Sequence, residues 1–376
     1  IQDGNAPCAP TDDGLANAEH GGTKNVRERP IRTAIAGLGR AGWDIHWRQL
    51  LKNHPAFKVV GVIEPLAERR AEAEAEIGCQ SFASLDEFLK APNAELVVLA
   101  TPSGGHGPES LACLERGLHV VVDKPMCQGV READAMMAAA ARNRRILTCY
   151  HPYRFSPDFI AMREMVRSGR LGRVVEIKCN RSDFSRRNDW VMIKTKGGGQ
   201  HNVWGSHSVD QCLQLAGSPP KDVFSDLQCT VTPGDADDHC KIIIRCKNNT
   251  IVDVEVSNCM AFPPQPEWMI AGTCGGLIKE TGGLRVKWFD PREAPPIAIR
   301  TGAAPDRRYG NDDQLPWHEE VLPLPKGRGF AEFYDNVAAA IRNGAPLLVT
   351  PESVRETIEV LEKARLQNPQ IWAGVE

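Results

Sequence analysis

The chain has 376 residues, of which 42% are hydrophobic and 25% charged, a composition typical of a folded globular protein with about two domains of roughly 150 residues each. Its 45 basic and 48 acidic residues leave a net charge of -3, which argues against nucleic-acid binding because nucleic-acid-binding domains usually carry a clear basic excess. No apolar run approaches the about 20 residues that a membrane-spanning helix needs, so a membrane protein is excluded.

The 12 cysteines do not form a C-x-x-C pair, so neither the spacing of a zinc site nor that of a redox dithiol is present, and no metal is expected. Several, such as Cys149 and Cys179, lie in apolar runs, where a free thiol behaves as a small buried hydrophobe. Reduced thiols in a chain of this length predict a cytoplasmic protein. Export after cleavage of an upstream signal is the alternative.

Residues 1–30 lack apolar periodicity, which predicts an extended N-terminal arm that is either mobile or laid on a neighbouring subunit. From Ile31 short apolar strands alternate with helices as far as residue 150. The helices include a segment that ends at Gly78 and one that begins at Ser84 with a capping-box Glu87. Because the strands are apolar on both faces, residues 31–150 predict a doubly wound parallel sheet covered on both sides. The expected strands are 31–39, 58–64, 95–101, 118–125 and 145–150.

The pattern changes after Tyr150. One helix at 157–169 is followed by long alternating strands, with a tight hairpin expected at Asn248-Asn249. Residues 151–376 therefore predict an α+β domain with a large, open, mostly antiparallel sheet. Within it, residues 290–329 are rich in proline, glycine and charge and predict a surface excursion. The expected strands are 173–184, 238–249, 250–258 and others within 267–290, and a closing helix pair is expected at 330–344 and 351–368.

The strongest motif is the G-x-G-x-x-G of residues 37–42, which follows a strand and opens a helix. In that context Gly37 makes a tight turn, Gly39 lets the backbone approach a pyrophosphate, and Gly42 lets the helix pack closely on the strand. Glu64 ends the next strand, where its carboxylate would accept hydrogen bonds from ribose hydroxyls and repel a 2′-phosphate. This favours NAD over NADP, although Arg69 or Arg70 could reach a 2′-phosphate. The expected cofactor-binding residues of this motif are Gly37, Leu38, Gly39, Arg40, Ala41, Gly42 and Glu64.

Further polar residues follow the predicted strands at the edge where open α/β sheets bind ligands. These residues are Thr101, Pro102, His106, Asp123, Lys124 and Pro125. Lys124 is expected to point into the crevice beside the cofactor, where a desolvated site and a cationic nicotinamide ring would lower its pKa. A second group, His201, Asn202, His207 and Asp210, follows the triple glycine at 197–199 and offers a histidine base for a hydroxyl proton.

Together these motifs resemble the glucose–fructose oxidoreductase / inositol dehydrogenase (Gfo/Idh/MocA) family, from about Ile31 to Leu366. The matching pieces are AGLGRAG, ATPSGGH, the strand-end DKP, PYRFSP with Arg154, GGGQHNVWGSH and the closing helix pair. The resemblance implies a Rossmann domain and a sheet domain that carries substrate and makes dimer or tetramer contacts. It also implies that Lys124 and His207 are catalytic, that Pro102, His106 and Pro125 line the cofactor, and that the substrate is a small sugar or polyol.

The chain departs from the family pattern at Val203, where many members place an aspartate four residues before the histidine. Asp210 or Asn202 is expected to replace the missing carboxylate. The segment that contains Asp189 and Trp190 is either a sugar-binding variant, with polar groups for hydroxyls and a ring face for the sugar, or an ordinary surface loop. The expected substrate-binding residues are Lys124, Arg154, Asp189, Trp190, His201, Asn202, His207 and Asp210.

Three functions remain open at this point. The first is an NAD-dependent dehydrogenase or reductase acting on the CH–OH group of a sugar, polyol or sugar derivative. The second keeps NAD but cleaves a glycoside through a transient 3-keto intermediate, with no net redox change. The third is a non-catalytic protein that senses NAD or a sugar.

Overall fold

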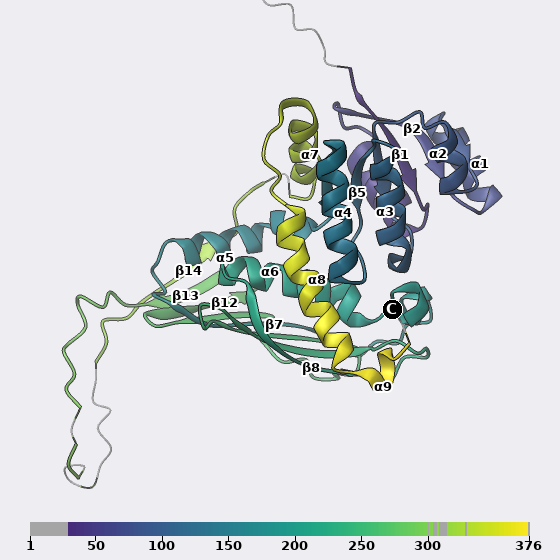
Figure 1. Ribbon diagram of the computed structural model, residues 1–376. Helices are drawn as coiled ribbons and strands as arrows, with labels where there is room; N and C mark the ends of the chain where they lie inside the picture. Colours follow the sequence, from purple (N-terminus) through teal and green to yellow (C-terminus); the bar gives the residue numbers. More distant parts are fainter. Residues whose placement is uncertain (1–28, 300, 304–306, 308–313, 328, 375–376) are drawn as a thin grey trace, which may run out of the picture.

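The computed structural model describes residues 29–299, 301–303, 307, 314–327 and 329–374. Two β-sheets organise them, and helices pack against both sheets (Figure 1). The extended arm predicted for residues 1–30 lies almost wholly outside the described residues.

Sheet A is the doubly wound parallel sheet that the sequence predicts. Its six strands have the order β3-β2-β1-β4-β5-β6, so the chain first moves outward from β1 in one direction and then crosses over to the other side. All four residues of β4 are buried, as expected for a strand covered on both faces. The strands are β1 (Ile31–Ala36), β2 (Phe57–Ile63), β3 (Gln80–Phe82), β4 (Leu96–Leu99), β5 (His119–Val122) and β6 (Leu147–Cys149).

Two helices around sheet A carry the predicted signals, one at its beginning and one at its end. Ser84 Oγ accepts from the backbone N–H of Glu87 at 3.2 Å, and Glu87 in turn accepts from the backbone N–H of Ala83 at 2.8 Å. Gly78 ends its helix in the left-handed conformation, with φ 71°. The helices are η1 (Ala41–Leu51), α1 (Ala67–Ile77), α2 (Leu85–Lys90), η2 (Ser103–Gly105), α3 (His106–Glu115) and α4 (Val130–Asn143).

Sheet B is open and mixed, with the order β14-β13-β12-β11-β7-β10-β9-β8. Only the β7–β10 pair is parallel among the neighbours of this sheet, and the predicted hairpin at Asn248-Asn249 joins β9 to β10, with Asn249 at φ 68°. The strands are β7 (Val174–Ser182), β8 (Pro220–Gln228), β9 (His239–Cys246), β10 (Ile251–Ser257), β11 (Trp268–Gly272), β12 (Gly275–Glu280), β13 (Gly283–Trp288) and β14 (His318–Pro323).

Two of these strands were not predicted. β8 opens with a proline, buries Ser225 and exposes Phe224, so its sequence does not alternate between apolar and polar residues. β14 lies inside the segment 290–329, so the prediction of an unbroken surface excursion is wrong at His318–Pro323. There the chain returns and pairs antiparallel with β13, which supplies backbone hydrogen bonds that composition cannot indicate.

Helices cover one face of sheet B and also join the two sheets. α5, α6 and α8 pack on this face (Figure 1). The last long helix, α8, places Val354 and Ile358 in the hydrophobic core of sheet A and Val360 and Leu361 in that of sheet B. The helices are η3 (Pro152–Phe155), α5 (Pro157–Arg167), η4 (Trp190–Met192), η5 (Lys194–Lys196), η6 (His201–Gly205), α6 (Ser206–Ala216), α7 (Ala331–Asn343), α8 (Pro351–Leu366) and α9 (Pro369–Trp372).

No helix in the described part of the chain is long and apolar enough to cross a membrane. The 11 cysteines within the described residues are all free thiols, and most of them are buried.

Candidate active site

The glycine loop after β1 has the shape that a dinucleotide pyrophosphate requires. Gly37 has φ 84°, and a Cβ atom there would lie 2.6 Å from the carbonyl oxygen of Ala100. A Cβ on Gly42 would lie 1.8 Å from the carbonyl oxygen of Gly37, so η1 can pack on the turn only because residue 42 has no side chain. A Cβ on Gly39 would meet no atom within 4 Å, which leaves open space where a phosphate group would approach the backbone. The loop therefore fits a dinucleotide.

Glu64 lies directly after β2 and is 3% exposed. Its carboxylate accepts from the backbone N–H of Leu38 at 2.8 Å and from that of Leu66 at 3.1 Å, which fixes it beside the glycine loop. Arg69 Nη1 lies 3.9 Å from this carboxylate, whereas Arg70 donates to the backbone carbonyls of Glu64 and Pro65. Arg70 is thus turned toward the backbone, and Arg69 alone of the two faces the carboxylate.

A hollow of about 390 Å³ adjoins the glycine loop. Arg40 stands exposed at its edge, and Ala41 is the first residue of η1. The lining residues are Leu38, Gly39, Arg40, Trp43, Asp44, Arg48, Arg69 and Glu72.

The residues predicted after β4 and β5 meet at one edge of sheet A. The imidazole of buried His106 lies between two backbone carbonyl oxygens, with Nδ1 2.8 Å from that of Pro125 and Nε2 2.9 Å from that of Thr101. His106 thereby ties the loop after β4 to the loop after β5. Thr101 Oγ1 donates to Glu109 at 2.5 Å, Pro102 is exposed, and Asp123 accepts from the backbone N–H of Lys124 at 2.8 Å.

Lys124 reaches from the end of β5 to the other half of the molecule. Its Nζ donates to the backbone carbonyl oxygen of Val203 at 3.0 Å, four residues before His207 at the start of α6. Burial lowers the pKa of Lys124, an effect that the negative charge of Asp123 only partly offsets. The pKa of His207 lies well below its ordinary value, first because of burial and then because Lys124, His151 when it is protonated, and Arg181 repel the imidazolium. The two predicted catalytic side chains therefore lie in one electrostatic environment, and both are biased toward their neutral forms.

Neither residue expected to replace the missing aspartate does so. Asp210 accepts two hydrogen bonds from Arg154, at 2.8 and 2.5 Å, and both side chains are buried. Asn202 donates to the carbonyl oxygens of Gly197 and Gly198 at 3.0 Å. That prediction is wrong, because these polar groups are already engaged elsewhere. The Val203 carbonyl is the group that accepts from Lys124.

Two of the remaining predicted substrate-binding residues, His201 and Asp189, are also engaged within the protein. His201 is fully buried, and its Nδ1 lies 2.6 Å from Asp237 Oδ1, which also accepts from Trp372 Nε1 at 3.2 Å. Asp189 caps η4 by accepting from the backbone N–H of Val191 at 3.2 Å and pairs with Arg187 at 2.6 Å. Trp190, in contrast, is 42% exposed. Arg154, His201, Asn202 and Asp210 thus hold the loops around the site.

Several residues that surround His207 were not predicted as site residues, although Tyr153 and Trp204 lie in the PYRFSP and GGGQHNVWGSH motifs. The imidazole contacts the rings of Tyr153, Trp204 and His151, with centroid separations of 4.8, 5.9 and 5.7 Å. Arg181, on β7, lies over the rings of Tyr153 and Trp204. Trp204 precedes His207 by three residues, but His151 and Tyr153 come from the segment around η3 and Arg181 from β7, so only the fold brings these three segments together.

The chain matches two family models that correspond to the two sheets. Residues 31–151 match the model of an oxidoreductase family with an NAD-binding Rossmann fold, and residues 159–278 match the GFO/IDH/MocA C-terminal domain. An uncharacterized oxidoreductase of Schizosaccharomyces pombe is 30% identical over 75% of this chain and 77% of its own length. The NADP-dependent scyllo-inositol 2-dehydrogenase of Bacillus subtilis is 25% identical over 89% and 92%. The crystal structure of an NAD-binding protein from Listeria innocua has the same fold, with a TM-score of 0.76, 24% identity and coverage of 91% and 96%.

Proposed function

The chain belongs to the Gfo/Idh/MocA family of oxidoreductases, and from this premise we propose that it transfers a hydride between NAD and a carbinol or ketone carbon of a sugar, polyol or sugar derivative. The contact between Lys124 Nζ and the Val203 carbonyl carries the proposal. It brings a lysine from the ligand-binding edge of sheet A to the start of the helix that bears His207. A substrate oxygen at this junction would meet a hydrogen-bond donor and a proton acceptor together.

The roles of the two side chains follow from their charges. When bound, the nicotinamide supplies the hydride acceptor or donor. Lys124 would donate a hydrogen bond to the reacting oxygen and stabilise the negative charge that develops there. His207, held neutral by burial and by neighbouring cations, would accept the hydroxyl proton during oxidation and return it during reduction.

The surroundings of Glu64 support NAD over NADP. A carboxylate that is buried and held by two backbone N–H groups would face the adenosine ribose, where it suits two hydroxyls and repels a phosphate. Arg70, one of the two residues that could serve a 2′-phosphate, is engaged with backbone carbonyls. The free thiols of the described residues support a reducing compartment such as the cytoplasm.

The uncovered face of sheet B supports a homodimer or homotetramer. The strand register places Phe224 opposite Ile243, Met269 opposite Ile278, and Val321 at the far edge, all on the face away from the helices. Phe224 and Val321 are 60% and 58% exposed. Light scattering should show an oligomer in the native protein and a smaller species in Ile243→Glu. A monomeric native protein would refute the assignment.

Substitution of Lys124 tests the catalytic proposal. In Lys124→Met, binding of NADH measured by its fluorescence should be retained, whereas reduction of NAD at 340 nm with an active sugar or polyol should fall by about 100-fold or more, because the developing charge loses its donor. The exposed Lys90→Met, which removes a charge from α2, is the matched control and should keep full turnover. Normal turnover of Lys124→Met would refute the proposed role.

A further inference from the structure

Arg181 lies in the wall of the site, close to His207. It follows the buried Ile177 and Cys179 on the helix-covered side of β7. Its guanidinium carbon lies 4.9 Å from the ring centroid of Tyr153 and 5.1 Å from that of Trp204. The imidazole of His207 packs against the same two rings. The guanidinium of Arg181 and the imidazole of His207 therefore pack against the same two aromatic side chains.

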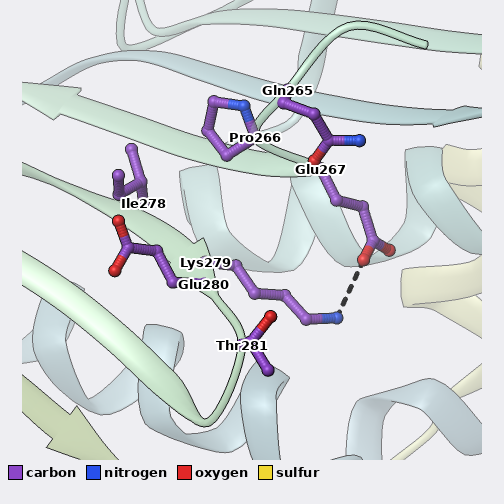
Figure 2. A pocket seen from close by; sticks show the side chains of 7 residues that line it. All are labelled: Gln265, Pro266, Glu267, Ile278, Lys279, Glu280 and Thr281. Carbon is purple, nitrogen blue, oxygen red and sulfur yellow. Dashed lines mark hydrogen bonds and ion pairs between the residues drawn. The ribbon is translucent and has the colours of Figure 1, made fainter. Parts of the chain in front are cut away.

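The N–H donors of Arg181 are only partly used by the described residues. Its side chain is 11% exposed, and Nη2 donates to Gln211 Oε1 at 2.9 Å. Its buried Nε has no hydrogen-bond partner among the described residues. The carboxylate of Glu267 lies 3.4 Å from Nε but also accepts from Lys279 Nζ at 2.9 Å (Figure 2). Lys279 Nζ also pairs with Asp158 Oδ2 at 2.7 Å, so two carboxylates face the two cations. Arg181 nevertheless keeps N–H donors for a further acceptor, because a guanidinium carries five of them.

The aromatic rings favour a planar anion as that acceptor. Rings stacked on a guanidinium leave its N–H donors pointing outward in its plane, in the fork that matches a carboxylate. Arg181 is also one of the cations that hold the pKa of His207 low, after burial and Lys124. A carboxylate on Arg181 would offset this repulsion and make the imidazole a better proton acceptor when the correct substrate is bound.

We propose that Arg181 forms a carboxylate subsite, and that the substrate is a sugar acid whose carboxylate binds Arg181 while its carbinol group lies at Lys124 and His207. This inference rests on the proposed function, because it assigns the substrate class of the same site. A single guanidinium fork matches the two oxygens of a carboxylate, whereas a phosphate dianion generally recruits further cationic donors. We therefore commit to the carboxylate.

The test measures binding rather than turnover, so that it does not depend on the hydride-transfer step. Calorimetry with the enzyme–NADH complex would compare a panel of uronates and aldonates with the matching neutral sugars and sugar phosphates, D-glucuronate, D-glucose and D-glucose 6-phosphate among them. At least one sugar acid should bind about 10-fold or more tightly than its neutral counterpart. Arg181→Met should weaken binding of that acid by about 10- to 100-fold and change binding of the neutral sugar by less than about 3-fold, as expected for lost charge-assisted hydrogen bonds.

Two further variants separate recognition from folding. Lys178→Met removes a charge from the opposite face of the same strand and should leave binding of the acid unchanged. Arg181→Lys keeps the charge without the fork and should bind the acid with intermediate affinity. Retained NADH binding in every variant separates this proposal from a failure of the proposed function. Equal binding of acids and neutral sugars, equal losses for both in Arg181→Met, or tighter binding of sugar phosphates would overturn it.

Discussion

The buried pair formed by Arg154 and Asp210 should be a major determinant of stability. Asp210 Oδ2 accepts from Arg154 Nε at 2.8 Å and Oδ1 accepts from Nη2 at 2.5 Å, which is a bidentate arrangement. Arg154 Nη1 continues to Ser353 Oγ on α8 at 3.0 Å, so the pair links η3, α6 and α8. Because both side chains are buried, Asp210→Asn leaves a guanidinium without its counter-charge in a region of low polarity.

The expected loss follows from that geometry. Removing one partner of a buried ion pair typically costs about 3–5 kcal/mol, against about 0–1 kcal/mol for an exposed pair. The matched control is Asp189→Asn, because Asp189 pairs with Arg187 at 2.6 Å but both side chains are substantially exposed. Urea denaturation followed by circular dichroism should therefore show a large loss of unfolding free energy for Asp210→Asn and at most about 1 kcal/mol for Asp189→Asn.

The pH dependence of stability provides a second readout. Burial alone would raise the pKa of Asp210, but Arg154 and His151 outweigh burial and hold this pKa below its ordinary value. A depressed carboxylate pKa stabilises the folded state above the unfolded value of about 3.9, and this contribution is lost as the pH falls through the folded pKa. Asp210→Asn should remove this part of the acid sensitivity. If Asp210→Asn were as stable as Asp189→Asn and only raised the KM for substrate, a stabilising role of Asp210 would be refuted. Asp210 would then be a substrate ligand.

Two further predictions concern the cofactor site. Gly42→Ala should abolish NADH binding in fluorescence titration and lower the unfolding temperature, because its Cβ would lie 1.8 Å from the Gly37 carbonyl oxygen. Gly39→Ala should weaken NADH binding but keep the unfolding temperature, because its Cβ would meet no atom within 4 Å. Equal effects of the two substitutions would contradict the roles given to these glycines. Glu64→Gln removes the negative charge but keeps an acceptor for the backbone N–H of Leu38. The ratio of kcat/KM with NAD to kcat/KM with NADP should therefore fall by about 10-fold or more. An unchanged ratio would show that this carboxylate does not select the cofactor.

Local patterns in the sequence were sufficient for the features whose partners lie nearby in the chain. The glycine loop, the capping box at Ser84 and Glu87 and the turn at Asn249 depend on backbone conformations that a few adjacent residues set. The alternation of apolar strands with helices predicted the doubly wound sheet for a different reason, because parallel neighbouring strands need a crossover connection that is usually a helix. Strand β14 was missed because its identity comes from pairing with β13, across a segment whose composition resembles a loop.

The tertiary structure alone decided which polar side chains are free to act. Arg154 and Asp210 are 56 positions apart, and nothing in either neighbourhood indicates that they neutralise each other. Lys124 and the Val203 carbonyl are 79 positions apart, and Arg181 reaches His207 only through rings contributed by η3 and η6. A sequence shows which chemical groups a chain carries, but hydrogen bonding and charge pairing act through space, so only the folded arrangement determines which of those groups remain available to a ligand.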